Sequence, residues 1–109
     1  MATIQRFEDI EAWQSARQSR RLIYGFTRSK PFAADFALVD QIRHAVISPG
    51  SNIAEGFERG GNRELIQFLS NAKGSVGETK DQLYCATDEN YITGPSSRRR
   101  IVSLTAHRV

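Results

Sequence analysis

Residues 62–89 read NRELIQFLSNAKGSVGETKDQLYCATDE and carry the strongest periodic signal in the chain. Apolar or small side chains recur there at intervals of three and four, which is the spacing of one face of an α-helix. These positions are Leu65, Phe68, Leu69, Ala72, Val76, Thr79, Leu83 and Ala86. The pattern predicts a helix about 42 Å long, with Asn62 as its N-cap.

Residues 7–27 and 32–56 show the same periodicity and predict two earlier helices, separated by a loop at 28–31. In the first helix, acidic residues lie in the opening turn and arginines follow, an order that suits the helix macrodipole. Its apolar stripe is interrupted at Ser19 and Arg20. The stripe of the second helix is continuous and consists of Leu38, Ile42, Ala45, Val46, Pro49, Ile53 and Phe57.

Pro49 lies inside the second predicted helix. Proline removes one amide donor there and clashes with the carbonyl of Ala45, so a kink is expected. The helix should end at a glycine in the left-handed conformation, which is Gly56, Gly60 or Gly61.

Strand signals are nearly absent, and a short fourth helix is predicted over 96–109, where Ile101, Leu104 and Ala106 form a weak apolar side. The expected fold is all-α: a single domain, 1–109, forming an antiparallel up-down four-helix bundle with a kinked second helix and a short or altered fourth helix. A half-length fourth helix would leave apolar surface uncovered on its neighbours, and another subunit or partner usually buries such surface.

The chain has 109 residues, of which 39% are hydrophobic and 25% charged, a composition that excludes wholesale disorder. No apolar run reaches the roughly 20 residues that span a bilayer, and no signal-peptide pattern is visible. Cys85 is the single cysteine, so no internal disulfide can form. Together these features predict a cytoplasmic protein without a membrane segment.

The formal net charge is +3, and it is unevenly distributed. Residues 1–93 hold eleven Lys/Arg and twelve Asp/Glu, whereas the short basic segment 94–109 holds four Arg and no acid. This asymmetry indicates an anionic partner such as RNA or DNA. The alternative is that 94–109 is a solvated terminus whose charge has no binding role. The candidate nucleic-acid-binding residues form two clusters: Arg17, Arg20 and Arg21, and Arg98, Arg99 and Arg100.

No pattern of an active site, metal site or cofactor site is present in the sequence. Cys85, His44 and His107 are far apart and lack zinc-ligand spacing. There is no nucleophile elbow, phosphate-binding loop or Glu-x-x-His pair. We therefore predict no catalytic residue, metal or cofactor, with Cys85 as a buried thiol and both histidines in solvent.

Glu55 and Glu78 lie near small or apolar neighbours and could face the core, where a carboxylate needs a hydrogen bond or a cation. Asn52 and two arginines are available as partners. These residues predict a structural polar cluster at the kink, and a ligand pocket there is the alternative. Its members are Arg43, Pro49, Ser51, Asn52, Glu55 and Arg59.

Several stretches between residues 7 and 92 resemble a known family, the small four-helix-bundle proteins encoded by intervening sequences of 23S ribosomal RNA genes. The matching stretches are Phe7-Glu8-Asp9 with Trp13 and Ala16, Ile23-Tyr24, Gln41-Ile42-Arg43, Ser51-Asn52-Ile53-Ala54-Glu55-Gly56, Arg59, Glu64 with Phe68-Leu69, Gly74-Ser75, Glu78, Leu83 and Tyr91-Ile92. The resemblance implies a four-helix bundle that forms ring-like homo-oligomers, often pentamers, with no assigned molecular function. A related accessory protein of diversity-generating retroelements is a basic ring that binds nucleic acid and a reverse transcriptase.

The chain departs from this family pattern at three places. The family usually has apolar residues at the positions of Ser19 and Arg20, and it usually has its proline at the position of Gly50. Its fourth helix is long and amphipathic, whereas 94–109 is short and arginine-rich. The departures put the helix-one interface, the position of the kink and the assembly of a ring in question.

Three functions are compatible with these observations. The first is a non-enzymatic oligomeric bundle that binds nucleic acid or a nucleoprotein through basic surface. The second is a protein-binding scaffold that assembles through apolar helix faces. The third is an enzyme or small-ligand binder that uses the region from Asn52 to Glu55. Salt-dependent binding of RNA or DNA would separate the first from the second, and a bound ligand at the kink would favour the third.

Overall fold

The computed structural model describes residues 3–93, and these residues contain three α-helices and no strand. The helices are α1 (Glu11–Arg28), α2 (Phe36–Arg59) and α3 (Asn62–Asp88), and the short 3-10 helices η1 (Phe7–Asp9) and η2 (Phe32–Ala34) precede α1 and α2. The all-α prediction is confirmed. The predicted fourth helix lies outside the described residues.

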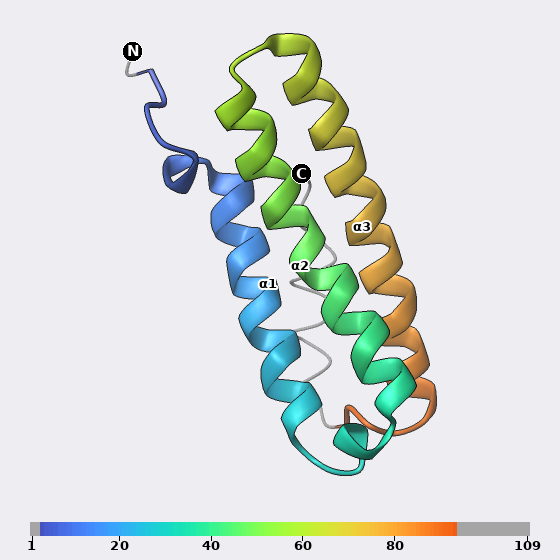
Figure 1. Cartoon of the computed structure of the whole chain (residues 1–109). Helices are drawn as coiled ribbons and strands as arrows, with labels where there is room; N and C mark the ends of the chain where they lie inside the picture. Colours follow the sequence, from blue (N-terminus) through green and yellow to red (C-terminus); the bar gives the residue numbers. More distant parts are fainter. Residues whose placement is uncertain (1–2, 94–109) are drawn as a thin grey trace.

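The three helices run antiparallel to their neighbours, with α2 between α1 and α3 (Figure 1). α2 therefore has to bury two sides of its surface at once. Its fully buried residues are Ile42, Ala45, Val46, Pro49, Gly50, Ile53 and Gly56. The apolar stripe predicted for this helix is confirmed, except that Leu38 and Phe57 at its two ends are only half-buried.

The connection between α1 and α2 sets the start of α2 four residues later than predicted. η2 occupies 32–34, and Asp35 then caps α2 because its Oδ1 accepts a hydrogen bond from the Leu38 amide at 3.2 Å. An N-cap acceptor of this kind satisfies one of the free amides of the first turn. At the N-terminus, η1 and an extended Ile10 similarly place the start of α1 at Glu11.

α2 ends at Gly60, whose φ of 78° lies in the left-handed region that glycine adopts without strain. Gly61 follows in extended conformation and is the N-cap of α3, so Asn62 is the first helical residue. The prediction of Asn62 as N-cap is therefore wrong by one position. α2 is helical throughout its length, including Pro49, and the expected kink stays a prediction.

The dense part of the core lies at the end where α1 connects to α2. Ile23, Phe32, Ile42, Leu83 and Ile92 are at most 3% exposed and pack together there. The residues after α3 complete this cluster, because the Tyr91 ring stacks on Phe32 at 5.1 Å. The Tyr91 hydroxyl donates to Oδ2 of Asp35 at 2.9 Å. One carboxylate thus caps α2 and also holds the chain that leaves α3.

The opposite end, at the α2–α3 turn, buries its apolar side chains only in part. The half-buried residues there are Phe57, Leu65, Phe68 and Leu69. α2 and α3 are nevertheless in close contact at Gly56, where a Cβ atom would lie 2.8 Å from the Cβ of Phe68.

Replacing Gly56 by alanine should destabilise the protein, since the new methyl group would force α2 and α3 apart. Overpacking of this kind costs about 1–3 kcal/mol and outweighs the gain in helix propensity of up to about 1 kcal/mol. The matched control is Gly74→Ala on the outer surface of α3, where no atom lies within 4 Å of the new Cβ. Urea unfolding should show opposite signs for the two variants, and a stabilised Gly56→Ala would contradict the close approach.

The hydrogen bond to Asp35 raises the pKa of Tyr91 above its ordinary value near 10, and burial and the negative charges of Asp35 and Glu89 act in the same direction. The folded state therefore holds this proton more tightly than the unfolded state. The resulting stabilisation is complete below pH 10 and is lost as the pH rises through the raised pKa. Thermal unfolding from pH 7 to pH 11 should show Tyr91→Phe less stable than the unmodified protein at neutral pH, with the difference shrinking above pH 10. A difference that stays constant would argue against the bond.

Candidate nucleic-acid interface

α1 and the loop after it form a basic stretch without acidic residues. Between Glu11 and Asp35 the sequence contains no Asp or Glu, and it contains the cations Arg17, Arg20, Arg21, Arg28 and Lys30. The sum of charges over residues 1–93 is close to zero because the acidic residues lie outside 12–34. That sum therefore does not reveal the local positive excess on α1. A local positive excess is therefore present on α1 as well as in 94–109.

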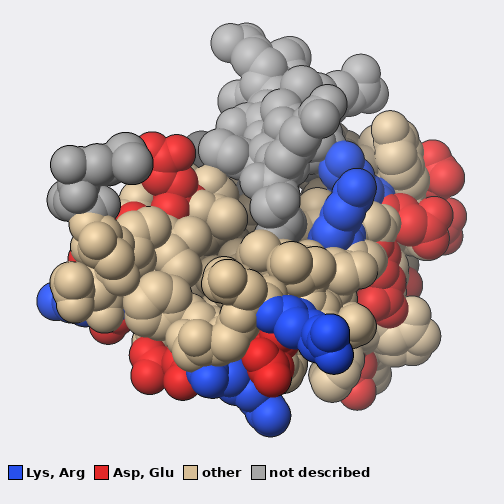
Figure 2. Space-filling model, turned by 90° about the horizontal axis from the view of Figure 1, so that it is seen from above, with Lys and Arg blue, Asp and Glu red and all other residues tan. Residues whose placement is uncertain are grey.

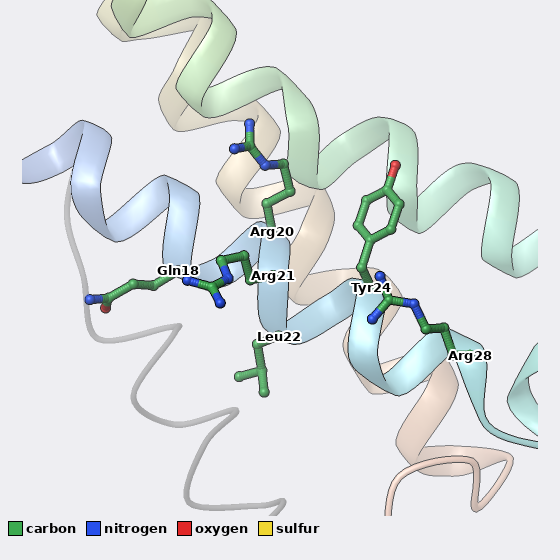
Figure 3. Close-up of a pocket in the computed structure, with 6 residues that line it drawn as sticks. All are labelled: Gln18, Arg20, Arg21, Leu22, Tyr24 and Arg28. Atoms are coloured by element: carbon green, nitrogen blue, oxygen red, sulfur yellow. The ribbon is translucent and has the colours of Figure 1, made fainter. Parts of the chain in front are cut away.

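Arg17, Arg21 and Arg28 form a row along one side of α1, which we call the arginine row. Their separations of four and seven residues bring them onto one face, and the row is about 16 Å long. All three residues are exposed. Arg20 is half-buried, and Figure 3 shows its side chain extending from α1 toward α2, as the Tyr24 side chain also does.

Two shallow open depressions lie along this surface. The first has a volume of about 810 Å³, and its described lining residues all belong to α1: Gln18, Arg20, Arg21, Leu22, Tyr24 and Arg28 (Figure 3). The second has a volume of about 440 Å³ and is lined by Arg6, Glu8, Trp13, Gln14, Arg17, Gln18 and Arg21. Gln18 and Arg21 line both depressions, so these form one continuous basic surface.

The arginine row carries no ion pair to an acidic residue within 3–93. The two ion pairs in this part of the chain are Arg6 with Glu8 at 3.4 Å and Arg59 with Glu55 at 2.7 Å. Arg17 instead lies over the Trp13 ring, 5.9 Å from its centroid. The charges of the row are thus not neutralised by carboxylates from the described helices, and an external anion can approach them.

Arg43 belongs to the contact between α1 and α2 and not to a cluster at Pro49. Its Nε donates to Oγ1 of Thr27 at 2.9 Å, and its guanidinium lies 4.4 Å from the centroid of the Tyr24 ring. Thr27 in turn donates to the Tyr24 carbonyl at 3.0 Å. This network fixes the C-terminal half of α1 against α2 and holds the surface around Tyr24 in place.

The predicted polar cluster at the kink is therefore wrong as a unit. Ser51 is exposed, and Glu55 pairs with Arg59 on the surface, where the two side chains are 53% and 55% exposed. Because these side chains are exposed, neither Glu55 nor the exposed Glu78 of α3 faces the core.

Asn52 is the polar member of that set that lies between α2 and α3, and its partners were not predicted. Its Nδ2 donates to the carbonyl and to Oγ of Ser48, both at 2.9 Å. The Ser75 hydroxyl of α3 donates to the same Ser48 Oγ at 2.8 Å. These bonds join α2 to α3 and use the Asn52 Nδ2 and both serine hydroxyls, which argues against a ligand pocket at this point.

The described residues contain no group of three side chains suited to hold a metal ion. Cys85 is exposed, so its prediction as a buried thiol is wrong, whereas His44 is exposed as predicted. His107 and the arginines Arg98, Arg99 and Arg100 lie outside the described residues. No helix within 3–93 has the length and apolar character needed to cross a bilayer.

At the end of the molecule that carries the α2–α3 turn, the visible surface is neither purely basic nor purely acidic (Figure 2). Figure 2 shows basic and acidic side chains interspersed with uncharged ones over this end, which carries the α2–α3 turn. A polyanion approaching here would meet both signs of charge. Among the described surfaces, the flank formed by α1 is therefore the better candidate for an anionic partner.

Sequence reasoning identified Arg17, Arg20 and Arg21 by their helical spacing but missed Arg28, Gln18 and Tyr24, which line the same surface. The signal that could have found Arg28 is the run of more than twenty residues without an acid. Counting charge in a sliding window, rather than over 1–93, reveals it.

Comparison with known proteins identifies the family of the chain. A comparison with curated proteins found no match. The family model described as 23S rRNA-intervening sequence protein matches residues 8–105, which is most of the chain. The match continues past Ile92, where the residues that carried the resemblance end, into the basic segment. The chain therefore belongs to the family of 23S rRNA-intervening sequence proteins.

Proposed function

We propose that this protein is a non-enzymatic nucleic-acid-binding protein and that the arginine row of α1 is its contact surface. The observation that carries the proposal is the geometry of Arg17, Arg21 and Arg28: exposed, on one side of one helix, and without an acidic partner within residues 3–93. Among common anions, a phosphodiester backbone presents charges at the regular spacing that such a row can meet repeatedly.

The chemistry of the row suits phosphate. Guanidinium groups donate two hydrogen bonds to one phosphate and stay charged at any physiological pH. Each phosphate that is neutralised releases counterions, so affinity falls steeply with salt. Backbone contacts carry no sequence information directly, and we therefore expect weak sequence preference.

We also propose that residues after Thr93 form the fourth helix of the bundle and that the protein assembles into a homo-oligomer, with a pentamer as the family resemblance implies. The extension of the family match to residue 105 supports the first proposal. The half-buried apolar side chains at the α2–α3 turn support the second, since a neighbouring subunit would cover them. A ring would repeat the arginine row in each subunit and strengthen binding through multivalency.

A protein-binding scaffold is the second candidate, and the outer side of α3 favours it. Ile66 and Tyr84 are 67% and 69% exposed. They are about five helical turns apart and so lie on the same side of α3. A partner protein could bind along this side without any contribution from the arginine row.

Replacing the arginine row by glutamine (Arg17→Gln, Arg21→Gln, Arg28→Gln in one variant) should weaken binding to labelled duplex DNA and structured RNA. For duplex DNA, a plot of log affinity against log salt should become less steep by about 2.7, because each neutralised phosphate contributes about 0.9. Fluorescence anisotropy of the full chain across a salt series measures both effects.

The matched control removes the same charge from α3, with Arg63→Gln, Lys73→Gln and Lys80→Gln, and should leave the slope unchanged. A third variant, Arg98→Gln, Arg99→Gln and Arg100→Gln, tests the basic segment. If only this third variant loses binding, the site is in that segment and not on α1. If the unmodified protein binds neither nucleic acid at low salt, the proposal is wrong and the scaffold is the better interpretation.

A further inference from the structure

We propose that the ligand of the arginine row is double-stranded nucleic acid, held by its phosphate backbone, and that single strands bind poorly. This inference rests on the proposed function and adds the class of ligand. It follows from the contacts of the aromatic rings near the row, whose faces are covered by other side chains.

Proteins that bind single strands combine a basic groove with aromatic rings on which unpaired bases stack. A usable ring needs an open face beside the cations. The aromatic residues of α1 are Trp13, Tyr24 and Phe26.

Trp13 is enclosed by its neighbours. The Phe7 ring packs against it in an edge-to-face arrangement, with the centroids 5.3 Å apart, and Arg17 lies over the ring at 5.9 Å. The indole also lies against Gly50 of α2, where a Cβ atom would be 3.6 Å from Trp13 Nε1. A base could stack on this ring only by displacing Arg17, which is one of the cations that would hold its phosphate.

Tyr24 and Phe26 are occupied as well. The Arg43 guanidinium covers Tyr24 at 4.4 Å and is itself fixed by Thr27. Both rings also pack against the core cluster of Ile23 and its neighbours. α1 therefore carries a row of cations suited to phosphate, but its aromatic rings already pack against other side chains.

Two aromatic residues are exposed on α2 and α3, and each has two acidic residues nearby, although Lys80 also lies one helical turn from Tyr84. Phe36 is 80% exposed and lies between Asp35 and Asp40 in the sequence, one helical turn from the latter. Tyr84 is 69% exposed, with Asp81 and Asp88 at three and four residues' distance on the same surface of α3. A strand that stacked on either ring would bring its phosphates close to carboxylates, which disfavours binding there.

The shape of the row also suits a duplex. A duplex carries about one negative charge per 1.7 Å of axis with both strands counted, so a duplex segment as long as the arginine row, about 16 Å, carries roughly ten charges, and those on the facing side are already at fixed positions. A single strand is flexible and would have to be ordered along the row, and no open ring on α1 compensates for that ordering.

The test uses the full chain and three fluorescent 20-mers of one sequence: single-stranded DNA, duplex DNA and duplex RNA. We expect both duplexes to bind about tenfold or more tightly than the single strand at moderate salt. If only one of the two duplexes binds, the inference stands, and the result identifies the ligand as duplex DNA or as duplex RNA. Single-strand binding equal to or tighter than duplex binding would overturn the inference and leave the proposed function intact, whereas failure of all three would overturn the proposed function.

A variant with Phe36→Ala and Tyr84→Ala is the control for stacking at the exposed rings. Both side chains lie largely in solvent, so the variant should fold, and circular dichroism would check this. We expect its residual single-strand binding to equal that of the unmodified protein. A loss of single-strand binding in this variant would show that bases stack on these rings, and it would contradict the inference.

Discussion

The architecture depends on one constraint, which is that α2 has to pack against a helix on each of two sides. Close packing on both sides requires small residues at the points of contact. Gly50 meets Trp13 and Ala16 of α1, where a Cβ would lie 3.6–3.8 Å from their nearest atoms, and Gly56 meets Phe68 of α3. Because α1 packs mainly against α2, several residues on its remaining surface are exposed, and this surface can hold the three arginines of the row at little cost in desolvation.

Most of the fold among the described residues could be predicted from periodicity, and two of the errors at single residues come from reasoning about residue type. Cys85 was expected to be buried because cysteine is usually buried. Its position does not belong to the stripe that contains Leu83 and Ala86, and the structure accordingly leaves it exposed. Gln82 is the converse case. It lies on the buried side, 7% exposed, and its Oε1 has no hydrogen-bond partner among the described residues.

The candidate site was only partly predictable, because closeness in sequence is not closeness on a helix surface. Ser51, Asn52 and Glu55 are neighbours in the sequence, yet only Asn52 reaches the contact with α3. The true partners of Asn52 are Ser48 and Ser75, and Ser75 comes from another helix, so no local pattern could reveal it. Arg17 and Arg21 were predictable because their spacing of four lies within one helix.

Within residues 3–93, three arginines lie over aromatic rings and two pair with carboxylates, and this has a consequence for recognition. Arg17, Arg43 and Arg59 lie over Trp13, Tyr24 and Phe68, respectively. A guanidinium that rests on a ring keeps its positive charge and loses part of its rotational freedom before any ligand binds. The entropy lost on binding is correspondingly smaller. Arg17 is thus both a member of the row and the cover of an indole, so one contact fixes a cation in place and closes a ring to bases. A surface built in this way favours a ligand that presents phosphates at fixed positions.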